Sequence, residues 1–559
     1  MTAPTLVMPE APTRASSFVE LGHGVAVHPR AYNALCRTLL TADAAELLAT
    51  LHRELGGRRL ALLADRAKRQ ASWDAGALPD YLDRQSPAVK GDWQVAPIPA
   101  DLRRRRVEIT GPASDSKMVI NMLSRSDSGE RADTAMLDLE DSMKPSWANV
   151  LAGHDNIVKA VRHELEYVKP GVAGQPPRVY RLDPQDMAKI MVRVRGLHLT
   201  EANVQVDGEA VAGAFFDLAI CLCHTLQLQV ARGETPKLYI PKVEHFLEAR
   251  LFNDAFVLLQ EKLGVPRGSL RATFLIETLP AAFQMEEILY ELREHAAGLN
   301  VGRWDKIFSD IKVLKNHPDR VLADRASIGL NRPWMKAYAL RLIQICHQRG
   351  AAAIGGMAAF TPGRTAELRQ HQTSKVLADK QFENSLGHDG CWVSHPYFIG
   401  PALSAFPQDH QLGVLHPELD RYPDLLPQAT PPRTEAGLRT NCRVGIAYLE
   451  GWRRDLGCVA WDNLMEDLAT LEISRAQTWQ WRRHAAELED GRRVDAALVR
   501  EIFEQELAQI CQELAEEGNL APAALEARQK AFAAAKEEAV TLFLAEEFAP
   551  FLSLASDLA

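Results

Sequence analysis

The chain has 559 residues, 47% of them hydrophobic, and a formal net charge of −9 with a pI near 6.1. This length allows a large core divided into roughly two to four domains. The acidic balance gives no electrostatic reason to expect nucleic acid or an anionic membrane as partner. The eight cysteines have no regular spacing, which favours a reduced compartment over a disulfide framework.

Targeting and membrane segments are not evident in the sequence. No run approaches the roughly eighteen apolar residues of a membrane helix. The N-terminus lacks the charged and apolar regions of a secretory signal, and the final SDLA is not a peroxisomal address. We therefore expect a soluble, cytoplasmic protein with no membrane, nucleic-acid or obligate protein partner.

Two local clusters have ordinary structural interpretations. The run Arg103–Arg106 leads directly into the apolar stretch VEITGP, and we interpret it as a solvated segment. Cys221, Cys223 and His224 lie in an apolar, helical-looking stretch without a second pair of ligands, so core cysteines are favoured over a zinc site.

Short apolar runs dominate the middle of the chain. Residues 1–100 are mixed, with helical patterns around 31–54 and a linker containing Pro and Trp. The runs that follow are nearly continuous rather than alternating, as is typical of strands buried on both faces of a parallel sheet. The eight predicted strands are 106–112, 134–141, 189–196, 237–244, 271–278, 298–305, 352–360 and 391–396.

Eight such strands with intervening helices predict an α/β fold of the TIM (β/α)8 barrel type over 101–405, since this barrel commonly has about 250 residues or more. A doubly wound open sheet is the alternative, although it would be unusually wide. A small inserted element is expected after the third strand, at about 197–235. A Pro-rich linker, 406–440, then leads to a helical C-terminal domain, 441–559.

Charged residues gather where the predicted strands end, which is where barrel enzymes carry their working residues. Any one of them could be a solvated loop residue, but a ring of acids needs a counter-charge. Carboxylates without nearby Cys or paired His select a hard ion, so Mg²⁺ rather than Zn²⁺. The strand-end residues are Asp138, Glu140, Asp141, Arg193, Arg195, Lys242, Glu244, Glu277 and Asp305.

Glu277 and Asp305 end two consecutive strands joined by one helical segment, so both are expected at the same rim. Gly302, in GRWD, could let backbone N–H groups approach an anion, although a plain turn fits the spacing equally well. P-loop, HExxH, GxSxG and GxGxxG motifs are absent.

The helical domain supplies one more acid. Asn463 is a good N-cap and Glu466 sits at the third helical position, as in a capping box. Asp467 has no such structural role in this interpretation, and it falls near a helix start that could face the barrel mouth.

Long stretches of the sequence resemble the malate synthase family, specifically its shorter A-type. The similarity covers essentially 100–490 and, more loosely, both ends. It is carried by RATFLIETLPAAFQMEEILYELREHAAGLNVGRWDKIFSDIK, VEITGP, DLEDSMKPSW, RVRGLHL, AIGGMAAFTP, GHDGCWVSHP and NLMEDLATLEISRAQTWQW.

The resemblance implies a TIM barrel with an N-terminal helical clasp (1–100), an inserted α/β element and a C-terminal helical plug (441–559). It also implies an acyltransferase of the glyoxylate cycle. The reaction is a Mg²⁺-dependent Claisen condensation of acetyl-CoA with glyoxylate, followed by thioester hydrolysis to malate and CoA.

Site residues follow from the same resemblance. Asp467 is expected to be the catalytic base, and Arg195 the cation that stabilises the enolate and contacts substrate. Arg193 lies in the same motif and could be mistaken for this cation, but the family match is to the arginine that precedes the glycine. Glu277 and Asp305 are the expected Mg²⁺ ligands. The remaining expectations are that Gly302, Arg303, Trp304 and Asp305 bind glyoxylate, that Asp141 and Glu140 line the rim, and that Ser142 and Pro362 lie near the adenine end of CoA.

Two rival interpretations remain at this point. A citrate-lyase-like or malyl-CoA lyase also uses Mg²⁺ and a Glu/Asp pair on a barrel, but it typically lacks the long C-terminal helical domain. A silent acyl-CoA-binding or scaffold protein would be expected to have lost Arg195, Glu277, Asp305 or Asp467, and all four are present.

Overall fold

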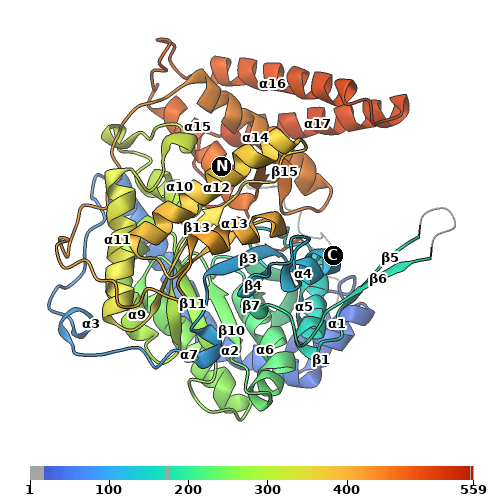
Figure 1. The fold of residues 1–559 in the computed structure, drawn as a ribbon, viewed down its shortest axis with the longest axis vertical. Helices are drawn as coiled ribbons and strands as arrows, with labels where there is room; N and C mark the ends of the chain where they lie inside the picture. The colour runs from blue at the N-terminus through green and yellow to red at the C-terminus, as the bar shows by residue number, and fades with distance from the viewer. Residues whose placement is uncertain (1–17, 172–175, 554–555, 558–559) are drawn as a thin grey trace.

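A closed barrel of eight parallel strands forms the centre of the computed structural model, which describes residues 18–171, 176–553 and 556–557 (Figure 1). Every predicted run overlaps one barrel strand, and the last strand pairs with the first to close the ring. The predicted TIM barrel is confirmed. Its strands are β3 (Val107–Pro112), β4 (Thr134–Asp138), β7 (Lys189–Arg193), β10 (Lys237–Ile240), β11 (Arg271–Ile276), β12 (Ala296–Val301), β13 (Ala352–Ala358) and β14 (Gly390–Val393).

Helices follow the strands and cover the outside of the barrel. The strands are apolar on both faces because one face meets these helices and the other fills the interior; every residue of β11 is buried, for example. The helices of this layer are α4 (Ser116–Leu123), α5 (Trp147–Arg162), α6 (Gly213–Ala231), α7 (Phe246–Lys262), α8 (Leu279–Ala282), α9 (Met285–Glu291), α10 (Arg303–Val313), α11 (Pro333–Gln348), α12 (Ala366–Leu386) and α13 (Ile399–Ala405).

The interpretation of Arg103–Arg106 as solvated is wrong for Arg105. Arg105 is 2% exposed, and its guanidinium donates to Glu108 (2.7 Å) and to Thr273 (3.0 Å) inside the barrel. It also donates to the hydroxyl of Tyr239 (3.0 Å). A charge buried here is tolerated because Glu108 pairs with it and two neighbouring hydroxyls accept further hydrogen bonds from it.

The helix α6 is the element that bears on the expectation of no membrane helix. Over Gly213–Ala231 it is long and apolar enough to cross a membrane by length and mean hydropathy (1.4), although polar residues interrupt its apolar runs. In the structure, 67% of the most apolar 18-residue stretch of this helix is buried, and the helix packs against both α2 and α5. It has the features of a core helix.

The N-terminal segment wraps around one side of the barrel (Figure 1). Its long helix α2 (Ala42–Asp74) packs against α6 and α7. The strands β1 (Val19–Gly22) and β2 (Val25–Val27) join two strands inserted after β7, in the order β1-β2-β8-β9. The remaining elements of these regions are α1 (Ala34–Leu39), α3 (Pro87–Lys90), β8 (Thr200–Val206) and β9 (Glu209–Ala212).

One element has no counterpart among the predictions. A two-stranded hairpin, β5 (Glu166–Lys169) and β6 (Arg178–Arg181), projects from the barrel between α5 and β7 (Figure 1). The targeting expectations concern residues that lie partly outside the described chain, namely 1–17 and the last two of SDLA.

The C-terminal helices sit over the end of the barrel at which the strands finish (Figure 1). Between 406 and 434 the chain contains neither helix nor strand, and α14 begins at Glu435, inside the predicted linker. Backbone hydrogen bonds fasten this part to the barrel rim, from Met465 N to Ala359 O (2.7 Å) and from Leu468 N to Asp141 O (3.3 Å). The elements are α14 (Glu435–Arg453), β15 (Val459–Trp461), β16 (Leu464–Glu466), α15 (Leu468–Arg483), α16 (Ala496–Glu516) and α17 (Pro522–Phe543).

A buried ion pair joins α2 to the barrel and supplies a test of this packing. Arg66 donates to both oxygens of Glu248 (2.7 and 2.6 Å) and to the carbonyl of Lys242 (2.7 Å). Arg66→Met leaves the Glu248 carboxylate buried without its cation, and we expect a loss of about 3–5 kcal/mol of unfolding free energy. Urea unfolding followed by circular dichroism measures it.

The matched control is Arg53→Met, on the same helix. Arg53 pairs with Asp207, but the two side chains are 47% and 51% exposed, so solvent replaces the pair and the unfolding midpoint should not move. Equal shifts for both variants would contradict the role assigned to the Arg66 pair.

Candidate active site

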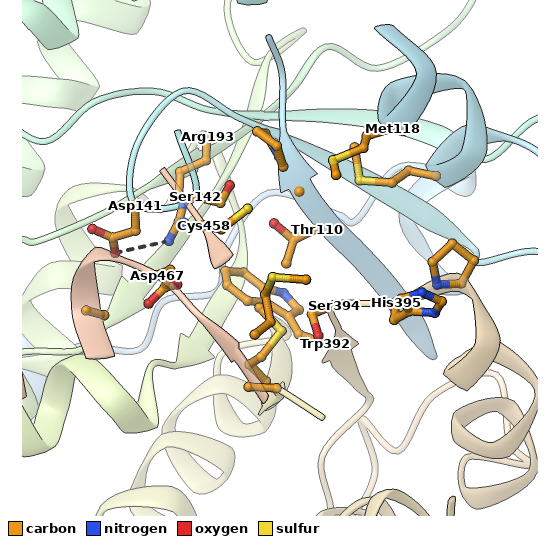
Figure 2. Close-up of a pocket in the computed structure, with 18 of the residues that line it drawn as sticks. Thr110, Met118, Asp141, Ser142, Arg193, Trp392, Ser394, His395, Cys458 and Asp467 are labelled. Atoms are coloured by element: carbon orange, nitrogen blue, oxygen red, sulfur yellow. Dashed lines mark ion pairs between the residues drawn. The ribbon is translucent and has the colours of Figure 1, made fainter. Parts of the chain in front are cut away.

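A cavity of about 760 Å³ opens at the C-terminal ends of the barrel strands. Its wall combines the ends of β3, β4, β7, β11, β12 and β13 with a segment of the C-terminal domain that includes Cys458, Met465 and Asp467. Figure 2 shows Asp141, Arg193 and Asp467 gathered on one side of this cavity, with Trp392 forming part of its floor. The cavity is therefore closed by two parts of the chain that are distant in sequence.

Carboxylates surround one ammonium group beside the cavity, and three of them, Asp141, Glu277 and Asp305, line it. The Nζ atom of Lys242 lies 2.5 Å from Asp141, 2.8 Å from Asp305, 3.4 Å from Glu140 and 3.7 Å from Glu277. These side chains come from the ends of β4, β10, β11 and β12, so barrel geometry brings them together. The predicted meeting of Glu277 and Asp305 at one rim is confirmed.

Electrostatic repulsion within this ring is strong. Burial raises the pKa of Asp305 well above its ordinary value, and Lys242 opposes the shift. Burial also raises the pKa of Glu140, with the Asp141 charge adding to the effect. The single ammonium group of Lys242 carries too little positive charge to neutralise the four carboxylates around it.

Gly302 allows the close approach of Glu277 to the start of α10. A Cβ atom at position 302 would lie 2.4 Å from the Glu277 Cβ, so any larger residue would displace that carboxylate. The helix starts at Arg303 with no side chain capping it, and the N–H groups of its first turn lack helical acceptors. Gly302, Arg303, Trp304 and Asp305 all line the cavity, as the sequence predicts for an anion-binding turn.

The donors around Glu277 and Asp305 fit a hard divalent cation. One oxygen of Glu277 accepts from the Lys242 backbone N–H (2.6 Å), while the other is buried without a hydrogen-bond partner. Within the described chain no three His, Cys, Asp or Glu side chains converge as a ligand set. Two carboxylates and no softer donor match Mg²⁺, which commonly binds one or two protein carboxylates and retains water.

The structure corrects the prediction for the segment around Asp467. The segment that contains Asn463 and Glu466 is a β-hairpin, and helix α15 begins at Leu468 with Asp467 as its N-cap. Asp467 accepts from the Thr470 backbone N–H (3.2 Å), and Thr470 reciprocates as the partner in a capping box. Asp467 therefore has a structural role, which the sequence interpretation denied it.

The same carboxylate faces the cavity, and burial raises its pKa to about 7, with the Asp141 charge adding to the shift. Glu466 points elsewhere and forms an ion pair with Arg325 (2.7 Å). A cap fixes the orientation of Asp467, and a pKa near neutrality suits a general base.

Of the two arginines in RVRG, Arg193 is the one that lines the cavity. Its guanidinium is held by two hydrogen bonds to Asp138 (2.7 and 2.6 Å), and its Nη1 lies 3.4 Å from Glu140 and 3.8 Å from Asp141. The last contact is the dashed line in Figure 2. One edge of the guanidinium thus remains directed at the reaction space.

Arg195, the residue predicted for that role, lies outside the cavity lining. It is 0% exposed and donates to both oxygens of Asp217 (2.8 and 3.0 Å) and to Glu201 (2.8 Å). Burial alone would raise the pKa of Asp217, but Arg195 and His154 lower it to about 2. The prediction for Arg195 is wrong in its geometry, because the strand ends at Arg193 and the chain then turns away from the barrel axis.

The two residues predicted near CoA differ in position. Ser142 lines the cavity and donates to Asp138 (2.5 Å), whereas Pro362 lies outside the lining.

The sequence did not predict the residues of the outer mouth of the cavity, which are Lys117, Arg125 and His395. Applying the strand-end rule to the connections after β3 and β14 would have found them, because both connections open onto the same rim.

Three family models match the chain. They are described as the malate synthase TIM barrel domain (residues 189–416), the malate synthase C-terminal region (432–556) and the malate synthase N-terminal domain (29–85). Together they cover six of the eight barrel strands, from β7 to β14, the helical region above the barrel and the helix that wraps around its side.

Curated relatives agree with these models. The chain is 46% identical to a malate synthase of Myxococcus xanthus over 86% of this chain and 87% of that protein. It is 42% identical to malate synthase A of Escherichia coli over 87% and 91% of the two chains. A glyoxysomal malate synthase of Ricinus communis is 40% identical over 89% and 88%. At this identity and coverage, the chain belongs to the malate synthase family.

Proposed function

We propose that this chain condenses acetyl-CoA with glyoxylate and hydrolyses the resulting thioester, giving malate and free CoA, as an acyltransferase of the glyoxylate cycle. The observation that carries the proposal is the position of Asp467. A capped carboxylate with a pKa near 7 faces a closed cavity, across from a guanidinium and beside a ring of acids.

Asp467 acts as the base in this reaction. The methyl group of acetyl-CoA is a weak carbon acid, so its proton must pass to a base held close to it and shielded from water. The capping box with Thr470 fixes the Asp467 carboxylate, and burial strengthens it as a base. Proton removal leaves an enolate whose carbon attacks the aldehyde carbon of glyoxylate.

Arg193 replaces Arg195 as the proposed partner of the enolate oxygen. Developing negative charge is stabilised best by a donor that is already oriented, and Asp138 orients the Arg193 guanidinium through two hydrogen bonds. The Arg195 guanidinium contacts Asp217 and Glu201 instead. We assign Arg195 a structural role.

Glyoxylate is proposed to bind between the carboxylate ring and the start of α10. Members of this family need a divalent metal, and we propose Mg²⁺ held by Glu277 and Asp305. When bound, the ion polarises the aldehyde as a Lewis acid. The Gly302 N–H already donates to the Tyr338 hydroxyl (3.1 Å). The N–H groups of Arg303, Trp304 and Asp305 hold the glyoxylate carboxylate, since a helix N-terminus favours an anion.

The CoA thioester reaches this point through the outer mouth. Lys117 and Arg125 lie along the cavity wall at that end, and their charges suit the phosphates of CoA. Ser142 lies deeper, beside Asp138. Lys117 therefore replaces Pro362 in the proposed CoA contacts.

We also propose a cytoplasmic location. All eight cysteines are free thiols and five are buried, which suits a reducing compartment. The Ricinus relative is described as glyoxysomal, so subcellular fractionation with a peroxisomal marker is the relevant test.

The first prediction concerns the reaction and its base. Purified protein with Mg²⁺ should release CoA thiol from acetyl-CoA only when glyoxylate is present, with malate as product. Treatment with EDTA should abolish release, and added Mg²⁺ should restore it. Asp467→Asn should lower kcat about 10²–10⁴-fold, because an amide cannot accept the proton. Retained turnover in Asp467→Asn would exclude this base.

The second prediction concerns pH. A base works when it is deprotonated, so kcat/KM of the parent enzyme should rise as pH increases through about 7 and then level off. The fall in kcat/KM at acid pH should be absent from the residual activity of Asp467→Asn.

The product of the reaction separates this function from its rival. Cleavage of malyl-CoA to acetyl-CoA and glyoxylate, without formation of malate, would instead support the lyase interpretation.

The third prediction separates the two arginines. Arg193→Gln should lower kcat per folded molecule about 10²–10³-fold, the usual effect of losing one oxyanion donor. Arg195→Gln should lower thermal stability by leaving Asp217 and Glu201 without their cation, while the folded fraction keeps kcat within a few-fold. The opposite pattern would return the enolate role to Arg195.

A further inference from the structure

Lys242 occupies a position that the proposed reaction does not use. Its ammonium group contacts Asp141 and Asp305 at 2.5 and 2.8 Å, with Glu140 and Glu277 at 3.4 and 3.7 Å. Among these four acids are both proposed metal ligands. We propose that Lys242 is a positioning residue that tunes the metal site, because its fixed positive charge weakens cation binding and disfavours ions of higher charge.

The backbone at Lys242 is built to hold this arrangement. Its φ is +55°, a left-handed conformation that a residue with a long side chain rarely adopts. In this conformation the Lys242 N–H donates to Glu277 (2.6 Å) while Nζ reaches Asp305. The Lys242 carbonyl accepts from Arg66 on α2. Lys242 thus touches both proposed ligands, one through its backbone and one through its side chain.

The charges explain why such a lysine affects ion choice. Four carboxylates in a buried ring attract any cation, and the attraction grows with the charge of that cation. A lysine in direct contact with two of them repels the same cation, and this repulsion also grows in proportion to the ion's charge. The lysine therefore penalises a trivalent ion more than a divalent one, and it leaves divalent binding reversible.

A purely structural lysine would behave differently. If Lys242 only held the carboxylates in position, its removal would loosen the ligands and weaken metal binding. If it competes with the metal, its removal strengthens binding. The sign of the change in metal affinity separates the two roles. The inference rests on the proposed function only in placing a divalent ion at Glu277 and Asp305.

The experiment measures Mn²⁺ binding by electron paramagnetic resonance and Tb³⁺ binding by luminescence, without substrates. Lys242→Met should bind Mn²⁺ about tenfold more tightly than the parent. Because repulsion scales with ion charge, the gain for Tb³⁺ should be about thirtyfold. Lys242→Gln keeps a hydrogen-bond donor without the charge and should show the same gains.

The matched control is Lys312→Met. Lys312 is also a buried lysine at this end of the barrel, but it pairs with Glu244 (2.6 Å). Its removal should leave both affinities unchanged. Glu277→Gln should abolish tight Mn²⁺ binding, which locates the ion at the ring.

Several results would overturn the inference. One is that folded Lys242→Met or Lys242→Gln binds Mn²⁺ with the same or a lower affinity than the parent. Another is that the affinities for Mn²⁺ and Tb³⁺ increase by the same factor. Folding of Lys242→Arg but of neither neutral variant would identify a structural counter-charge and also exclude the proposal. Thiol release is measured separately: its absence with the predicted metal affinities would refute the reaction alone, and no Mn²⁺ binding by the parent would refute the metal site.

Discussion

An excess of buried negative charge at the end of the barrel is the constraint to which the rest of the structure responds. The two buried cations that contact these acids, Arg193 and Lys242, face more acids than they can neutralise. Burying an uncompensated carboxylate is expensive unless it is paired, protonated or bound to a cation. The acids concerned are Asp138, Glu140, Asp141, Glu277, Asp305 and Asp467. A site with this excess of carboxylates favours the binding of a further cation, and a divalent metal ion is the simplest one.

The parts outside the barrel hold this surplus in place. The helix α2 sends Arg66 to the carbonyl of Lys242, and the C-terminal region fastens itself to the rim through Met465 and Leu468. The second attachment buries Asp467 beside Asp141, whose charge adds to the rise in the pKa of Asp467. Closing the cavity and tuning the base are thus consequences of one docking event.

Much of this could be predicted from the sequence, for identifiable physical reasons. Parallel strands buried on both faces appear as continuous apolar runs, so all eight barrel strands were found, and their ends located Glu277 and Asp305 at one rim. The hairpin β5–β6 was missed because it packs little of its length into the core and shows no such run; Val168 and Val179 are 47% and 46% exposed. Asn463 looked like a cap because capping signals are local, whereas the hairpin that contains it depends on docking to Ala359 and Thr361, far away in sequence.

The two arginines of RVRG show where pattern alone fails. Residues two apart on a strand share a face, which would direct both guanidinium groups at the same site. The rule holds only while the strand continues, and β7 ends at Arg193, so Arg195 turns toward Asp217 instead. Each arginine has a bidentate carboxylate, yet their environments differ. Arg195 also donates to Glu201 and has no exposure, while Arg193 retains one edge near acids that line the cavity. All three guanidinium nitrogens of Arg195 donate to fixed carboxylates, so this side chain has little left to offer a developing enolate. The Nη1 group of Arg193 faces the cavity instead, and for this reason we propose Arg193 as the partner of the enolate.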